Sequence, residues 1–150
     1  MLQQGEAWDK VRNLLATQRF AVLSTQSESG PYASLIAFWA PENLDHVLFT
    51  TMRATRKFSF LTRVPRVALL FDNRSNRDTD LGEAAALTAT GKAREVSDEA
   101  ERATALEGFL KKHPELSTFA ASAGCALVRV DIDTLYLVTR FQDVVELRPT

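Results

Sequence analysis

Apolar residues recur every three or four positions in three segments of the chain, a period typical of amphipathic helices. The predicted helices, with their inward-facing residues, are Ala7 to Gln18 (Trp8, Val11, Leu14, Leu15), a segment that begins after position 51 (Phe58, Leu61, Val64), and Asp98 to Lys112 (Ala103, Leu106, Phe109, Leu110). A short further helix is predicted from Glu115 to Ala121. These helices are separated by longer stretches with a different pattern.

Alternating or continuous apolar runs bounded by turn residues predict seven strands. They span Arg19 to Gln26, Pro31 to Ala40, His46 to Thr51, Arg66 to Asp72, Ala84 to Val96, Cys125 to Val138 and Phe141 to Leu147. Gly30 ends a turn where positive φ is needed, and Gly91 inside the fifth strand predicts a bulge or a barrel corner. Short turns between strands favour an antiparallel barrel with helical covers over a doubly wound parallel sheet.

The second strand is apolar on both faces, because Ser34 is the one polar side chain between Ala33 and Trp39. Such a strand is buried on both sides, either as a barrel wall or as an interface. Ser34 is then either a satisfied core hydroxyl or a donor to a ligand.

Composition and charge limit the classes of function. A chain of 150 residues with 45% hydrophobic and 25% charged residues is expected to form one soluble domain over 1–150. Its net charge of −1 gives no overall field toward nucleic acid or acidic membranes. No run is apolar enough to span a membrane and no signal-peptide pattern occurs, so a cytoplasmic protein is expected. One cysteine and two separated histidines predict no metal site.

Three cations stand where the second helix is expected to begin. Arg53, Arg56 and Lys57 fall at its first turn, and the chain has no Asp or Glu from His46 to Phe71. Each cation at a helix N-terminus costs about 0.3–1 kcal/mol, because that end already carries partial positive charge. A bound phosphate would reverse the sign of this term. The segment is therefore either a phosphate-binding site or a solvated basic face.

The sequence carries none of the common catalytic patterns. It has no GxGxxG, Walker loop, CxxC, HExxH or GxSxG motif and no evident pair of nucleophile and base, so no catalytic residue is predicted. A phosphate site without acid–base groups fits a protein whose bound cofactor supplies the chemistry.

Three segments resemble the pyridoxamine 5′-phosphate oxidase-like, FMN-binding split-barrel family. They are the hairpin at 21–36, the stretch Phe49-Thr-Thr followed by Thr55-Arg-Lys, and the strand Pro65-Arg-Val-Ala-Leu-Leu-Phe. The resemblance covers roughly residues 8 to 147 and depends on the order and spacing of the segments. It implies a mainly β (α+β) fold, a six- to seven-stranded antiparallel split β-barrel with flanking helices, FMN as cofactor and a homodimer with two flavins at its interface.

The resemblance also implies which residues hold the flavin. Arg56 and Lys57 match the family's phosphate-binding pair, and Arg53 would add a contact. The other implied positions are Thr50 and Thr51 beside the ribityl phosphate, backbone groups of Ser34, Leu35, Ile36 and Ala37 along the ring and ribityl chain, and Asn73, Arg74 and Ser75, which would approach across a subunit boundary.

The expected function is an FMN-dependent oxidoreductase or flavin reductase-like enzyme with an unidentified small-molecule substrate. A deazaflavin (F420-like) cofactor could use the same cradle. A non-catalytic flavin- or haem-binding protein is the further alternative, with His46 and His113 as the available imidazoles. Nucleic-acid binding is not expected, because Phe58 and Phe60 fit a buried helix face. The chain lacks the vitamin-processing oxidase's basic C-terminal signature, so oxidation of pyridoxamine phosphate is not expected either.

Overall fold

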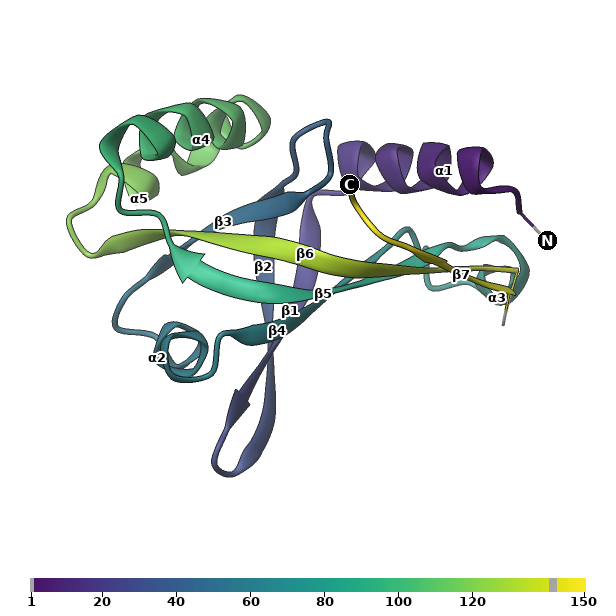
Figure 1. The fold of residues 1–150 in the computed structure, drawn as a ribbon, viewed down its shortest axis with the longest axis horizontal. Helices are drawn as coiled ribbons and strands as arrows, with labels where there is room; N and C mark the ends of the chain where they lie inside the picture. Colours follow the sequence, from purple (N-terminus) through teal and green to yellow (C-terminus); the bar gives the residue numbers. More distant parts are fainter. Residues whose placement is uncertain (1, 141–142) are drawn as a thin grey trace.

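A computed structural model describes residues 2–140 and 143–150, and its strands form a single antiparallel sheet that closes on itself (Figure 1). The strands are β1 (Phe20–Ser27), β2 (Gly30–Trp39), β3 (His46–Met52), β4 (Arg66–Asp72), β5 (Ala86–Glu95), β6 (Cys125–Thr139) and β7 (Asp143–Leu147). Their order is β3-β2-β1-β4-β5-β6-β7, and a further pairing of β3 with β6 closes six of them into a barrel. The predicted barrel is confirmed, although positions 141 and 142 of the last expected strand lie outside the described residues.

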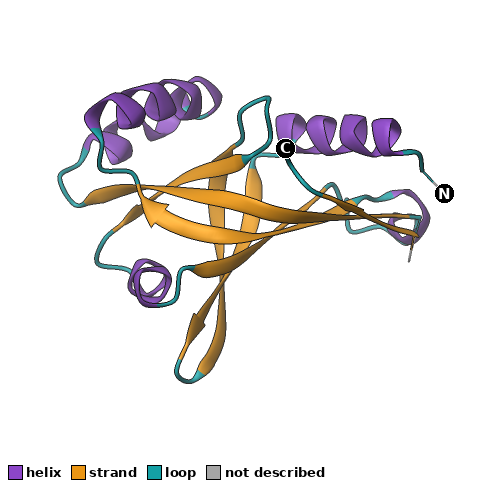
Figure 2. Cartoon of the chain, in the orientation of Figure 1, coloured by secondary structure: helices purple, strands orange, loops and turns teal. Residues whose placement is uncertain are grey.

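Helices lie around the outside of the barrel (Figure 2). They are α1 (Gln4–Thr17), α2 (Arg56–Arg63), α3 (Asp80–Glu83), α4 (Glu99–Lys112), the 3₁₀ turn η1 (Pro114–Leu116) and α5 (Ser117–Ala121). α3 was not predicted, because four residues are too few to show a period. No helix in the described part of the chain is both long and apolar enough to cross a bilayer.

Side chains that alternate along the strands fill the barrel interior. Leu23, Phe38, Phe49, Leu69 and Phe71 are fully buried, and the rings of Phe38 and Phe71 meet edge to face with centroids 4.7 Å apart. α1 adds its predicted apolar residues to the same core, and α2 adds the buried Leu61. The apolar residues that recur at every second position along the strands are therefore the ones that face the barrel interior.

Two predicted inward positions on the helices are wrong. Ala103 is exposed, whereas Ala105 and Phe109 are the buried residues of α4. Residue 103 lies about 200° around the helix from residue 105 at about 100° per residue, so both cannot face the barrel. Val64 is the C-cap of α2 and is 37% exposed, because Pro65 forces the preceding residue into extended backbone.

Both glycines singled out by the sequence hold the predicted conformations. Gly30 has φ of 117° at the end of the β1–β2 turn. At Gly91 the pairing of β5 with β6 shifts register, so a bulge stands there. A Cβ atom on Gly91 would lie 2.1 Å from the backbone oxygen of Asp131, which only glycine avoids.

Lys112 joins the C-terminal ends of α4 and α1. Its Nζ atom donates to the carbonyl of Leu15 at 3.0 Å and lies 3.9 Å from the centroid of the Phe38 ring. Both contacts favour the charged ammonium, but burial, assisted by the charge of Arg19, prevails and lowers the pKa of Lys112 to about 8.

This shift predicts a pH-dependent contribution to stability. Between about pH 8 and 10.5 the unfolded chain binds a proton at Lys112 that the folded chain has released, so stability rises with pH in that window. The free energy of unfolding of the wild type, minus that of Lys112→Met, is expected to increase between pH 8 and 10. Denaturant titrations at several pH values measure it, and a constant difference would contradict the assignment.

Candidate functional site

The N-terminus of α2 presents two cations with no acidic neighbour in its first turn. Arg56 and Lys57 are the first two residues of the helix, and Arg56 is exposed while Lys57 is half-buried. Within residues 2–140 and 143–150, neither side chain forms an ion pair or a hydrogen bond. The free N–H groups of the first turn point out of this end of the helix, which also carries the positive pole of the helix dipole. This end can therefore bind an anion.

Hydroxyl groups fix the turn that leads from β3 into α2. The hydroxyl of Thr55 donates to the carbonyl of Met52 at 2.8 Å and accepts the N–H of Phe58 at 3.4 Å as the N-cap. Thr51, which is 3% exposed, places its own hydroxyl 3.2 Å from that of Thr55. Thr51 therefore holds the helix start in place, while Thr50 is half-buried opposite Leu127 on β6.

The barrel is open between β2 and β3 beside this helix start. The two strands pair only through Phe38 with Phe49 and Trp39 with Leu48. Because the N–H of Phe38 donates toward β1, at the carbonyl of Arg19, alternation turns the backbone groups of Ala37 and Leu35 toward the opening. Leu35 lies beyond the last pair of β2 with β3, so its main-chain donor and acceptor face the opening without a β3 partner.

The side chains of the four β2 positions point in different directions. Ile36 is buried in the barrel interior, Ala37 is half-buried, and Leu35 is 67% exposed on the outer face. Ser34 faces inward opposite Leu23, and its hydroxyl is the one buried side-chain polar atom of the described residues without a partner. Continuing the β2–β3 register would place Ser34 level with Arg53, beside the start of α2.

Arg53 precedes α2, so its predicted place in the first turn of the helix is wrong. Its guanidinium donates to both carboxylate oxygens of Glu95, at 3.2 and 2.7 Å, and to the carbonyl of Ala123 at 3.0 Å. The hydrogen bonds between Arg53 and Glu95 raise the pKa of Arg53 and lower the pKa of Glu95. The counter-charge comes from β5, outside the stretch that lacked acids in the sequence.

The loop residues Asn73, Arg74 and Ser75 follow the end of β4 that is remote from α2. A strand of seven residues spans about 23 Å, so within one chain the loop does not reach Arg56 or Lys57. Asn73 closes the loop by accepting the N–H of Ala85 at 2.7 Å. Ser75 donates to Asp80 at 2.8 Å, which lowers the pKa of Asp80. These residues can share a site with α2 only between two chains.

An apolar face covers the outside of the sheet beside the opening. It consists of Phe20 and Val22 on β1, Leu35 on β2 and Leu70 on β4, and Phe20 is 55% exposed. These residues line an open cavity of about 400 Å³ that extends to Asp72 and Arg74. Arg74 pairs with Asp72 at 3.0 Å, so the β4 loop borders this face. We call the four residues the outer apolar face.

The two histidines differ in what their ring nitrogens contact. His113 is 1% exposed, and its Nε2 lies 2.8 Å from the carbonyl of Phe38, so that nitrogen is occupied by the backbone. His46 begins β3 and has Nδ1 hydrogen-bonded to Asp45. Across the described residues no group of three or more His, Cys, Asp or Glu side chains could hold a metal ion. Cys125 is buried, and burial raises the pKa of its thiol.

Comparisons with known proteins place this site in context. A family model described as pyridoxamine 5′-phosphate oxidase matches residues 7–139. No curated protein matches the sequence significantly.

Solved structures of low identity share the fold. A haem-binding protein from Mycobacterium smegmatis superposes with a TM-score of 0.84 at 15% identity, over 99% of this chain and 60% of its own. A haem storage protein from Vibrio cholerae gives 0.74 at 15% identity, over 87% and 92% of the two chains. An FAD-binding protein from Mesorhizobium loti gives 0.68 at 19% identity, over 91% and 94%. These likenesses concern the fold alone.

Proposed function

We propose that this chain, which belongs to the pyridoxamine 5′-phosphate oxidase family, binds FMN. It then acts as an FMN-dependent oxidoreductase on a small molecule. The observation that carries the proposal is the pair of unpartnered cations, Arg56 and Lys57, at the start of α2. A doubly charged phosphate is the group that such a helix end accommodates best.

The residues around this helix end fit the rest of the cofactor. The open edge of β2 offers main-chain groups of Leu35 to the polar rim of a flavin ring, and the hydroxyl of Ser34, buried without a partner, would gain one in the ribityl phosphate. Thr51 and Thr55 hold the helix start rigid through their hydroxyl contact. Bound FMN would supply hydride and electron transfer, while these residues bind and orient it.

The contribution of Arg53 to the site is expected to be small, because Glu95 and Ala123 occupy its guanidinium. Asn73, Arg74 and Ser75 enter the proposal as groups of a second chain. A homodimer formed over the outer apolar face would cover Phe20 and Leu35 and bring the partner's loop toward the opening between β2 and β3.

The dimer yields a direct prediction. Leu35→Glu places a charge in the middle of the outer apolar face, and a buried unpaired charge opposes association strongly. The variant is expected to be a monomer and to bind FMN more weakly than the wild type. Sedimentation velocity measures the first effect, with Ser29→Glu at the exposed hairpin tip as the control. A dimeric Leu35→Glu protein would reject this interface.

Titration of the purified chain with FMN tests the cofactor. Quenching of flavin fluorescence is expected at protein concentrations in the micromolar range, and an F420-type deazaflavin, titrated in parallel, is expected to bind more weakly. Tighter deazaflavin binding would replace FMN with that cofactor in the same cradle. No binding of either compound would remove the proposal.

Haem is the second candidate, because two of the structural neighbours are described as haem proteins. His46 is the imidazole whose Nε2 has no hydrogen bond in the described structure, so it is the available ligand. Haem binding would give a Soret band that His46→Ala removes. A Soret band that is unchanged in His46→Ala, or absent from the wild type, would reject this version.

A further inference from the structure

A groove lies between α4 and the strands β2 and β3, at the end of β3 that is remote from α2. Figure 1 shows where these elements lie. Its volume is about 420 Å³, within the range of small-molecule sites. The lining comprises Trp39, Pro41, His46, Leu48, Ala100, Glu101, Thr104, Ala105 and Arg129. Apolar side chains form most of the wall, and a few polar groups converge at one end.

The apolar wall is rigid. Leu48 and Ala105 form the floor and are 1% and 7% exposed. Trp39 lies against α4 at Gly108, where a Cβ atom would come within 2.3 Å of the indole ring. A fixed aromatic wall of this kind suits a flat apolar ligand, because no side chain must be ordered on binding.

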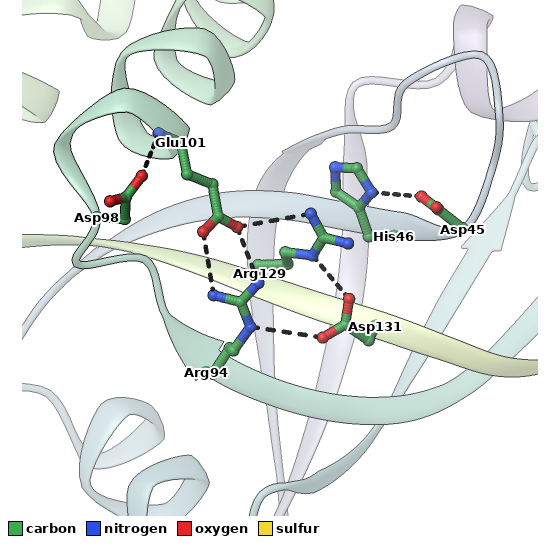
Figure 3. A network of polar contacts seen from close by, with 7 residues as sticks. All are labelled: Asp45, His46, Arg94, Asp98, Glu101, Arg129 and Asp131. Carbon is green, nitrogen blue, oxygen red and sulfur yellow. Dashed lines mark hydrogen bonds and ion pairs between the residues drawn. The ribbon is translucent and has the colours of Figure 1, made fainter.

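When the imidazole of His46 is neutral, one of its nitrogens in the groove is a hydrogen-bond acceptor. The carboxylate of Asp45 accepts only, so the Nδ1 atom of His46 carries the proton of their hydrogen bond. In the neutral ring Nε2 is then an acceptor, and no group in the described chain donates to it. Figure 3 shows this nitrogen on the side of the ring away from Asp45.

A charge network closes the polar end of the groove (Figure 3). Glu101 on α4 pairs with Arg94 at 2.8 Å and with Arg129 at 3.5 Å. Asp131, the cross-strand partner of His46, accepts from Arg129 at 2.7 Å. The two guanidinium groups balance the carboxylates of Glu101 and Asp131, and Asp45 beside His46 brings the net charge to −1. An anionic ligand is disfavoured, and a neutral hydrogen-bond donor is favoured.

We propose that this groove is a second binding site, separate from the flavin cradle, for a small neutral aromatic molecule that carries a hydroxyl or ring N–H donor. The ring lies against Trp39 and the floor of Leu48 and Ala105, and the donor meets Nε2 of His46. The site does not depend on FMN binding, because the stretch of β3 from Leu48 to Met52, about 13 Å at about 3.3 Å per residue, lies between the groove floor and the turn into α2.

The probe is 2-naphthol, titrated into the full chain labelled with ¹⁵N-histidine. The chain has two histidines, so the spectrum is simple and the buried His113 serves as an internal control. The Nε2 resonance of His46 is expected to shift in a saturable way while the resonances of His113 stay unchanged. 2-Methoxynaphthalene, which lacks the donor, is expected to bind at least about tenfold more weakly.

Matched variants locate the probe. Ala100→Trp fills the groove and is expected to weaken 2-naphthol binding at least about tenfold, whereas Ala103→Trp, on an exposed face of the same helix, is expected to leave it within about twofold. His46→Phe keeps a ring and removes the acceptor, so it is also expected to lose about tenfold. Circular dichroism verifies that each variant folds.

Four results would overturn the proposal. The first is the absence of a saturable shift up to about 1 mM 2-naphthol. The second and third are that Ala100→Trp binds 2-naphthol as tightly as the wild type, and that the wild type binds 2-methoxynaphthalene as tightly as 2-naphthol. The fourth is a haem Soret band that Ala100→Trp abolishes, which would assign the groove to haem. Each of these can occur while FMN binding is intact, so the proposed function stands or falls separately.

Discussion

Replacement of both Arg56 and Lys57 with alanine is expected to weaken FMN binding about a thousandfold, because each charged hydrogen bond to phosphate contributes about 2 kcal/mol. Neither side chain has another partner in the described structure, so its removal leaves no other charge unpaired. The loss therefore reports the contact with the ligand itself. Each single variant is expected to lose about thirtyfold on the same scale.

The double variant is not expected to lose stability. The two cations oppose the helix dipole, so their removal is expected to raise the free energy of unfolding by about 0.6–2 kcal/mol in the absence of ligand. Arg63→Ala removes a cation from the last turn of α2 and serves as the matched control. Fluorescence titration gives the affinities. An unchanged FMN affinity in the double variant would reject the phosphate cradle.

Gly91→Ala is expected to lower the free energy of unfolding by about 3 kcal/mol, at the upper end for overpacking, because the neighbours of the new methyl group are backbone atoms. Its Cβ would lie 2.1 Å from the oxygen of Asp131 and 3.0 Å from the carbonyl carbon of that residue. The β5–β6 pairing must therefore open locally at the bulge.

Urea denaturation measures this effect, and Gly5→Ala is the control. Gly5 lies in α1 with nothing within 4 Å of the added Cβ, so alanine there is expected to stabilise by about 0.5–1 kcal/mol through helix propensity. A loss below about 1 kcal/mol in Gly91→Ala would mean that the sheet adapts to the methyl group and that the bulge does not require glycine.

The fold was accessible from the sequence because its signals are local. Alternation along the strand from Arg66 to Asp72 predicted bounds that the structure reproduces, and the turn chemistry at Gly30 predicted the first hairpin. Gly91 gave the bulge for the same reason. Backbone restrictions of single residues and the period of two need no knowledge of the rest of the chain.

The charge partners were not accessible, because they come from distant segments. Glu95 neutralises Arg53 from a strand that the sequence places 42 positions away. No acid lies near Arg53 in sequence, so the sequence predicted three free cations where the described part of the chain has two. The sequence near a residue does not show which charges from distant strands meet it in the folded barrel.

The groove under α4 shows the same limit. Asp45 and His46 are neighbours in sequence, so the sequence alone could indicate their hydrogen bond. Their association with Arg129 and Glu101 depends on the pairing of β3 with β6 and on the position of α4. Whether the loop residues Asn73, Arg74 and Ser75 reach a flavin depends on a second chain and stays a prediction.

The central claim is that the start of α2 binds the phosphate of a flavin, and the ratio of two dissociation constants tests it most directly. Riboflavin has the ring and ribityl chain of FMN without the phosphate. The wild-type chain is predicted to bind FMN at least about a thousandfold more tightly than riboflavin, and this ratio is predicted to fall about a thousandfold in the variant lacking Arg56 and Lys57. Equal affinity of the wild type for FMN and riboflavin would contradict the account.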